Sequence, residues 1–128
     1  MKGELVKAED LLTQARVQLQ RLSALFEERK QELLETEAQI KAAAAAGNAD
    51  KVMALQSRLS ALDKSISELG VSQAECARRV ESIEEYLNIL RSRLRRLREE
   101  AESLTAAGEQ MRLARIKVQI EAITGRKE

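Results

Sequence analysis

The sequence predicts an all-α fold: an antiparallel coiled-coil hairpin followed by a short third helix, in a rod that resembles a three-helix bundle. Helix-favouring residues dominate, Pro is absent, and the chain has only one Phe, one Tyr and no Trp. Apolar residues recur at alternating intervals of three and four along three segments. Glycine interrupts this pattern at two points, where a helix can end and the chain can reverse. With so few aromatic side chains, we expect a thin assembly of helices rather than a thick core.

The first predicted helix covers about residues 3–46, and its apolar stripe has the spacing of a coiled-coil a/d seam. An ordinary surface helix would show a broader apolar face. Ten of the twelve stripe residues are apolar, and the polar ones are Arg29 and Thr36. The stripe consists of Leu5, Ala8, Leu12, Ala15, Leu19, Leu22, Phe26, Arg29, Leu33, Thr36, Ile40 and Ala43.

The second predicted helix covers about residues 49–105, and Gln73 is its only polar stripe residue. Gly70, followed by Ser72 and Glu75 at capping-box spacing, offers a place where this helix could end and restart. Because the stripe keeps its phase across this point, and an interior Gly costs only about 1 kcal/mol relative to Ala, we favour one continuous helix with a soft point at 70–72. The stripe consists of Val52, Leu55, Leu59, Leu62, Ile66, Leu69, Gln73, Cys76, Val80, Ile83, Leu87, Leu90, Leu94, Leu97, Ala101 and Leu104.

The reversal between these helices is placed at Gly47 and Asn48, which both tolerate the left-handed conformation that ends helices. In an antiparallel pair, residues that meet have numbers with a constant sum. A sum of 95 pairs every residue of the first stripe with one of the second, so that Leu12 meets Ile83. The midpoint of this pairing falls between Gly47 and Asn48, so register and residue chemistry predict the same turn.

A third helix is predicted at about residues 109–124, after a turn at Gly108. A sum of 217 pairs Ile120 with Leu97 of the second helix. The second helix is therefore shared: its first two-thirds face the first helix and its last third faces the third. We expect residues 1–128 to form a single domain. The third stripe consists of Leu113, Ile116, Ile120 and Ile123.

Charge and cysteine content indicate a cytoplasmic protein. The formal net charge of +1 gives no overall attraction to nucleic acid or to membranes. The single cysteine, Cys76, excludes an internal disulfide and fits a reducing compartment. No stretch approaches the roughly 18 apolar residues of a membrane span, and the first ten residues are too charged for a signal peptide.

Nothing in the sequence predicts an enzyme, a cofactor, a metal site or a small-molecule substrate. The chain has no His, so the usual neutral-pH base and the commonest metal ligand are both missing. Phosphate-binding glycine loops are absent as well. Cys76 lies in the seam opposite Leu19, where a thiol behaves as a small buried hydrophobe. The acidic residues Glu27, Glu28, Glu32, Glu35 and Glu37 are expected to form a solvated helix flank.

The segment LRSRLRRLREE concentrates positive charge near the end of the second helix. It could bind an acidic protein surface, a nucleic-acid backbone or lipid headgroups, but it lacks interleaved aromatic residues for stacking on bases. The alternative is local neutralisation, because three Arg–Glu pairs stand four residues apart. These pairs are Arg95 with Glu99, Arg96 with Glu100, and Arg98 with Glu102.

Apolar residues beside this segment widen the surface of the hairpin. Tyr86 and Ile89 do so together with Leu87 and Leu90 on the second helix, and Leu11 and Leu25 do so on the first. Such residues need cover, which a second copy of the chain, in a homodimer, could supply. The candidate partner-binding residues are Tyr86, Ile89, Arg91, Arg93, Arg95, Arg96 and Arg98.

Two segments resemble known helical families. Glu75-Cys76-Ala77-Arg78-Arg79-Val80-Glu81 is similar to a stretch of the second helix of tubulin-folding cofactor A, although the Pro-containing break before that stretch is missing here. The hairpin KAAAAAGNADKVMALQSRL resembles the turn of phage-shock protein A, whose amphipathic membrane helix has no counterpart in these residues. Because heptads recur by convergence, no functional residue is carried over from either family.

The sequence as a whole favours a non-enzymatic scaffold or adaptor that binds protein partners through its helical faces and self-associates. One alternative is a tubulin chaperone of the cofactor A type. The other is a membrane-remodelling or anionic-surface-binding protein of the phage-shock type. The sequence favours a protein partner over nucleic acid or a membrane, and it leaves the identity of that partner open.

Overall fold

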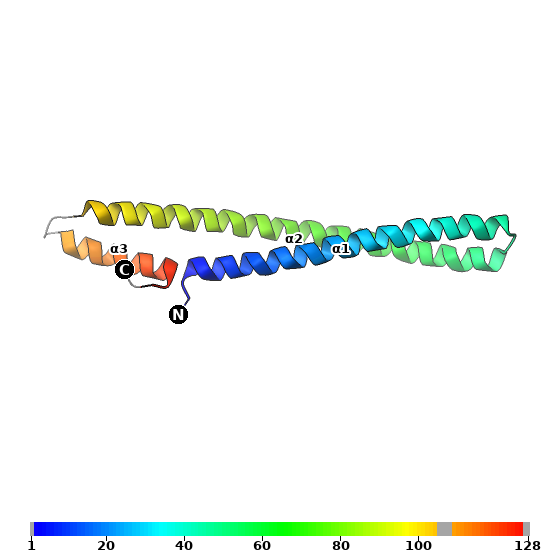
Figure 1. Cartoon of the computed structure of the whole chain (residues 1–128), viewed down its shortest axis with the longest axis horizontal. Helices are drawn as coiled ribbons and strands as arrows, with labels where there is room; N and C mark the ends of the chain where they lie inside the picture. Colours follow the sequence, from blue (N-terminus) through cyan, green and yellow to red (C-terminus); the bar gives the residue numbers. More distant parts are fainter. Residues whose placement is uncertain (1, 105–108, 127–128) are drawn as a thin grey trace. The chain divides into compact units, whose positions relative to one another are not determined.

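The computed structural model describes residues 2–104 and 109–126 and confirms the all-α class. The described residues form three helices and no strand: α1 (Glu4–Ala45), α2 (Ala49–Ser103) and α3 (Gln110–Thr124) (Figure 1). The expected end of the second helix at residue 105 and the expected turn at Gly108 lie outside the described residues.

The buried side chains recorded for the described residues all belong to the predicted stripes. Every stripe residue of the three helices is buried or half-buried, including the polar residues Arg29, Thr36 and Gln73. This outcome confirms the seam positions, because a shift of one residue in any helix would have turned its stripe towards water.

The turn between α1 and α2 is built from the two residues that the sequence indicated. Gly47 has a φ of 72°, the left-handed conformation that glycine adopts without strain. The N–H of Asn48 donates to the carbonyl of Ala43 and the N–H of Gly47 donates to that of Ala44, which is a Schellman motif. Asn48 then caps α2, since its side-chain Oδ1 accepts the N–H of Lys51 at 3.2 Å.

The described chain divides into two compact units, and both α1 and α2 contribute to each. One unit, Val17–Arg78, contains the hairpin turn. In this unit Gln73 Nε2 donates to Ser23 Oγ at 2.8 Å, so the polar seam residue is satisfied across the helix pair. Phe26 lies beside Gly70. The numbers in both pairs add up to 96, within one residue of the predicted register.

The polar seam residue Arg29 reaches the edge of the seam rather than its centre. Its guanidinium binds Glu32 at 3.0 Å and Glu28 at 3.7 Å, and its side chain keeps about a third of its exposure. The aliphatic stem can therefore pack in the seam while the charge stays near water. Thr36, the other polar residue of this stripe, is buried and donates its hydroxyl to the carbonyl of Glu32 at 2.7 Å.

α2 is continuous through Gly70, where the sequence allowed a break. A Cβ added at Gly70 would lie 3.5 Å from the ring of Phe26, an ordinary van der Waals distance. We expect Gly70→Ala to stabilise the protein by about 0.5–1 kcal/mol, because Ala has the higher helix propensity and reduces the entropy of the unfolded chain. Urea denaturation followed by circular dichroism measures this change. A lower midpoint for Gly70→Ala would show that the glycine is required at this position.

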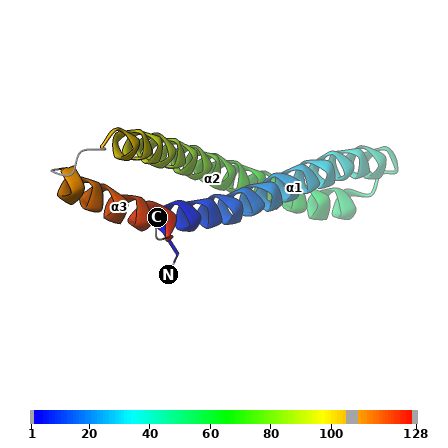
Figure 2. The same cartoon turned by 60° about the vertical axis from the view of Figure 1, so that its left-hand side comes forward.

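The other unit combines Met1–Arg16 with Arg79–Glu128. In it α3 lies beside the end of α2, as both views show (Figures 1 and 2). Arg112 of α3 binds Glu100 of α2 at 3.2 Å on one flank of this pair, and Arg16 of α1 binds Glu84 of α2 at 3.8 Å. The buried apolar side chains of this unit include Ala8, Leu12, Ala15, Val80, Leu87, Leu90, Leu94, Ile116, Ile120 and Ile123.

α3 ends where α1 begins. Gly3 is buried, and a Cβ added to it would overlap the backbone of Ile123, Thr124 and Gly125. Gly125 closes α3 in the left-handed conformation and donates its N–H to the carbonyl of Glu121. The two helices therefore occupy successive stretches of α2, and the negative end of the α3 dipole lies next to the positive end of the α1 dipole, which is a favourable arrangement.

Candidate protein-interaction site

The part of α2 that precedes the arginines presents large apolar side chains to solvent. Tyr86 is 46% exposed and Ile89 is 63% exposed, whereas their neighbours Leu87 and Leu90 are buried in the seam. The sequence grouped these four residues as one widened apolar surface. Only Tyr86 and Ile89 are available to a partner.

Helical spacing divides the seven candidate residues between two flanks of α2. Tyr86, Ile89, Arg93 and Arg96 follow one another at intervals of three, four and three, so they share one flank. The remaining three candidates lie on the other flank, where they line a hollow of about 390 Å³ together with Leu94, Glu99 and Glu102. These three residues are Arg91, Arg95 and Arg98.

Leu11 of α1 extends the first of these flanks. It is 55% exposed and directly precedes the buried Leu12, just as Tyr86 directly precedes the buried Leu87. In an antiparallel coiled coil, positions that precede equivalent seam residues lie on the same side of the pair. Leu25 belongs to the other compact unit and is half-buried. We call Leu11, Tyr86, Ile89, Arg93 and Arg96 the apolar–arginine flank.

Two of the three Arg–Glu pairs that the i,i+4 spacing suggested do not form among the described residues. Within residues 2–104 and 109–126, no ion pair joins Arg95 to Glu99 or Arg96 to Glu100. Glu100 instead binds Arg112 of α3. In the same described part of the chain, Arg91 and Arg93 also have no ion pair. The apolar–arginine flank therefore carries two guanidinium groups whose donors face water.

No protein-family model, curated protein or solved structure matches this chain. A helical fold of this kind serves many functions, so architecture alone decides little. The function must be inferred from the exposed side chains themselves.

Several acidic residues of α1 that the sequence singled out form ion pairs with neighbouring basic side chains. Among the acidic residues of α1, Glu27 binds Lys30 at 3.7 Å, while Glu28 and Glu32 bind Arg29. Lys30 also lies over the ring of Phe26, 4.3 Å from its centroid.

Across the residues that the structure describes, no group of three or more Cys, Asp or Glu side chains is arranged to hold a metal ion. In that same part of the chain, no helix combines the length and apolarity needed to cross a membrane.

α3 has an outward face that the seam pattern does not reveal. Met111 and Val118 are exposed, seven residues apart, on the side of α3 opposite its buried isoleucines. The signal that could have found them is a second set of apolar residues outside the three-four stripe of this helix, completed by Ala114 and Ala122.

Proposed function

We propose that the protein is a non-enzymatic scaffold or adaptor that binds another protein through the apolar–arginine flank. The observation that carries this proposal is the clustering of three exposed large apolar residues, Leu11, Tyr86 and Ile89, beside two arginines that have no ion pair within the described residues. The absence of His from the sequence also supports a binding role over catalysis.

The composition of the flank is that of a protein-binding surface. Tyr and Arg are enriched in the residues that dominate binding energy at interfaces, because each combines a large contact area with hydrogen-bond donors. Leu11 and Ile89 add apolar area that gains free energy when a partner removes it from water, at roughly 25 cal/mol per Å². A lone exposed leucine would need no explanation, but neighbouring exposed apolar residues are typical of binding surfaces.

The partner that fits this flank is an amphipathic helix with an apolar stripe and acidic residues at its edge. A helix laid along α2 would place its apolar side chains on Tyr86 and Ile89, one turn apart, and its carboxylates within reach of Arg93 and Arg96. Guanidinium groups bind carboxylates in a bidentate geometry, which fixes the orientation of the partner.

Photo-crosslinking from the flank tests this proposal. A photoreactive amino acid is placed at Ile89, and as a control at Met53, which is equally exposed on α2 but lies in the other compact unit. We expect one protein to crosslink from position 89 and not from position 53. Crosslinking of the same proteins from both positions would contradict a dedicated site on the flank.

The arginines give a matched control for affinity. With the crosslinked protein purified, Arg93→Ala/Arg96→Ala is compared with Arg91→Ala/Arg95→Ala, which removes the same charge from the other flank of the same helix. Loss of a residue that dominates the binding energy costs about 2 kcal/mol or more. We therefore expect the first variant to raise the dissociation constant by roughly 30-fold. The second variant is expected to change it by less than about threefold, because screened charges outside an interface contribute little. Equal losses would indicate non-specific attraction to positive charge.

A further inference from the structure

The flank of α2 that does not belong to the apolar–arginine flank contains a hollow rich in guanidinium groups. This is the hollow of about 390 Å³ that Arg91, Arg95 and Arg98 line. A second hollow of about 390 Å³ adjoins it, because Arg98 and Glu102 line both. Residues of both α2 and α3 line the second hollow, within one compact unit, and Lys117 of α3 adds a fourth cation. We call the two adjoining hollows the basic groove.

Positive charge predominates in the basic groove. Its four basic side chains stand against two carboxylates, those of Glu99 and Glu102. Within residues 2–104 and 109–126, no ion pair involves Arg91, Arg95 or Lys117. Both glutamates are exposed on flexible stems, so their carboxylates can turn towards water when an anion arrives. The basic groove therefore attracts anions.

The basic groove lacks the apolar surroundings of the apolar–arginine flank. None of the exposed large apolar residues recorded for the described part of the chain lines it, and Leu94 and Ile120 at its base are buried. A protein helix or a lipid layer would find little apolar surface to cover there. The ligand that suits such a groove is a small, strongly hydrophilic anion.

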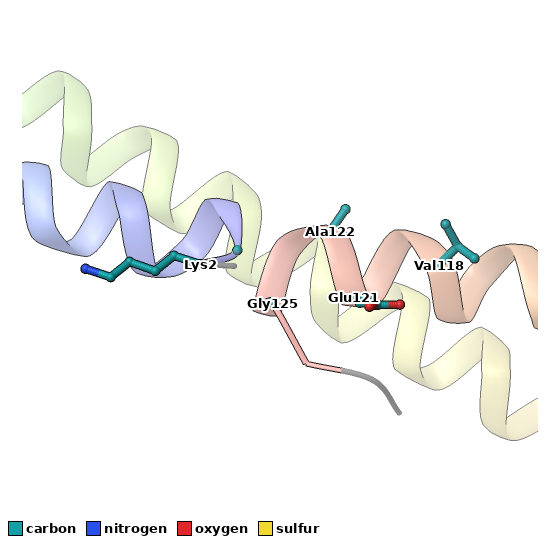
Figure 3. A pocket seen from close by; sticks show the side chains of 6 residues that line it. Lys2, Val118, Glu121, Ala122 and Gly125 are labelled. Carbon is teal, nitrogen blue, oxygen red and sulfur yellow. The ribbon is translucent and has the colours of Figure 1, made fainter.

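A hollow elsewhere in the same unit lacks this excess of positive charge. It has a volume of about 370 Å³ and lies where α3 meets the start of the chain, with Val118 and Ala122 beside it (Figure 3). Its charged lining residues are Lys2 and Glu121. Because one charge of each sign cancels the other, this hollow offers no net attraction to an anion.

The arrangement of the cations favours phosphate over carboxylate. Arg91, Arg95 and Arg98 follow one another at intervals of four and three, so they form a row of about 10 Å along α2, at roughly 1.5 Å per residue. Lys117 joins the end of this row from another helix. Phosphate oxygens accept hydrogen bonds from several directions, whereas a carboxylate has two oxygens in one plane. The row is longer than a single phosphate group, so two or more linked phosphates fit it best.

We propose that the basic groove is a binding site for a soluble oligophosphate, a chain of two or more linked phosphate groups. The guanidinium groups of Arg91 and Arg95 bind successive phosphates, each with a pair of parallel hydrogen bonds. The ammonium group of Lys117 contributes a point charge at the end of the row. This ligand is additional to the protein partner of the apolar–arginine flank, because the two sites use different flanks of α2.

Titration of the isotope-labelled full chain with sodium tripolyphosphate in a low-salt buffer tests the proposal. Backbone amide signals and arginine Nε–H signals are followed by NMR. We expect saturable shifts that are largest at Arg91, Arg95 and Lys117. Tripolyphosphate is expected to bind at least about tenfold more tightly than orthophosphate, because only the longer anion reaches several cations of the row at once.

Two double variants of α2 give a matched comparison. Arg91→Ala/Arg95→Ala is expected to raise the dissociation constant for tripolyphosphate by about tenfold or more, because both bidentate contacts are lost. Arg78→Ala/Arg79→Ala removes the same charge from an earlier, exposed part of α2, and it is expected to change the constant by less than about threefold. Lys117→Gln is expected to raise it by about threefold. Circular dichroism checks that helix content is unchanged in each variant.

The carboxylates of the basic groove allow a test in the opposite direction. Glu99→Gln/Glu102→Gln preserves side-chain size and removes two negative charges from the lining. We expect this variant to lower the dissociation constant for tripolyphosphate by about threefold or more, because like charges near the anion are removed. A variant that only disturbed the helix would not bind the anion more tightly.

Three results would overturn the proposal. The first is the absence of saturable shifts with tripolyphosphate. The second is equal weakening by the two arginine double variants, which would indicate a diffuse attraction to positive charge. The third is binding to vesicles of phosphatidylcholine and phosphatidic acid without binding of tripolyphosphate, which would assign the groove to a membrane surface. The protein partner is tested separately through Arg93→Ala/Arg96→Ala, so failure of either proposal leaves the other unaffected.

Discussion

Replacing Leu87 with Ala is expected to lower the free energy of unfolding by about 3 kcal/mol, within the range of roughly 2–5 kcal/mol found for Leu→Ala in cores. Leu87 is only 1% exposed and belongs to the seam of the unit that contains α3. Removing its isobutyl group loses both the transfer free energy and the contacts around it, since a packed seam closes only partly over the space left. Urea denaturation followed at 222 nm measures the difference.

Ile89→Ala is the control for this experiment. It removes a similar apolar side chain two residues further along α2, at a position exposed to water. Its free energy of unfolding is expected to change by less than about 0.5 kcal/mol. If the two variants were equally destabilised, Ile89 would have a structural role, and its place in a binding surface would have to be abandoned.

Gly3→Ala is expected to destabilise the docking of α3 by about 2 kcal/mol, the middle of the range for overpacking. The added Cβ would overlap backbone atoms of Ile123, Thr124 and Gly125, which cannot move aside as a side-chain rotamer can. The effect should be local, because α3 and the first residues of the chain must separate to relieve the overlap. Hydrogen exchange is therefore expected to accelerate in α3 and much less around Gly47.

Gly70→Ala provides the contrasting result, since the same chemical change there is expected to stabilise the protein. The two glycines differ in what a methyl group meets: an aromatic side chain at an ordinary distance beside Gly70, and main chain beside Gly3. Unchanged exchange of α3 amides in Gly3→Ala would mean that the contact between the two helix ends contributes little to stability.

The seam could be predicted from the sequence because the heptad pattern is redundant. Each of Leu5, Leu12 and Leu19 reports the same phase, so one polar intrusion such as Arg29 does not obscure it. The turn could be predicted equally well, because the register and the chemistry of Gly47 and Asn48 independently indicated the same place. At Gly70 the local capping signal competed with this long-range phase, and the phase prevailed in the structure.

The absence of the expected ion pairs at Arg95 and Arg96 among the described residues could not be read from spacing. A pair four residues apart is worth only about 0.2–0.5 kcal/mol on a helix surface, so a neighbouring helix easily offers a better partner. Glu100 illustrates this, because it binds Arg112 of α3 rather than Arg96. The distribution of the five arginines is different, because their spacing in the sequence already indicates that they surround the helix rather than line one face.

The outward face of α3 remained hidden for a different reason. The three-four stripe of α3 accounts for its isoleucines and leaves the remaining residues as surface. The exposure of Met111 and the hollow beside Val118 become apparent only in the structure.

The adjacency of Gly3 and Gly125 bears on how the chain could be reconnected. α3 and α1 run in the same direction along α2, and the end of one touches the beginning of the other. A short peptide linking residue 125 to residue 3 would connect the end of α3 to the start of α1, and fresh termini could then be opened at the solvent-facing Gly47. A circular permutant of this design would keep each interhelical layer while exchanging which segments are synthesised first.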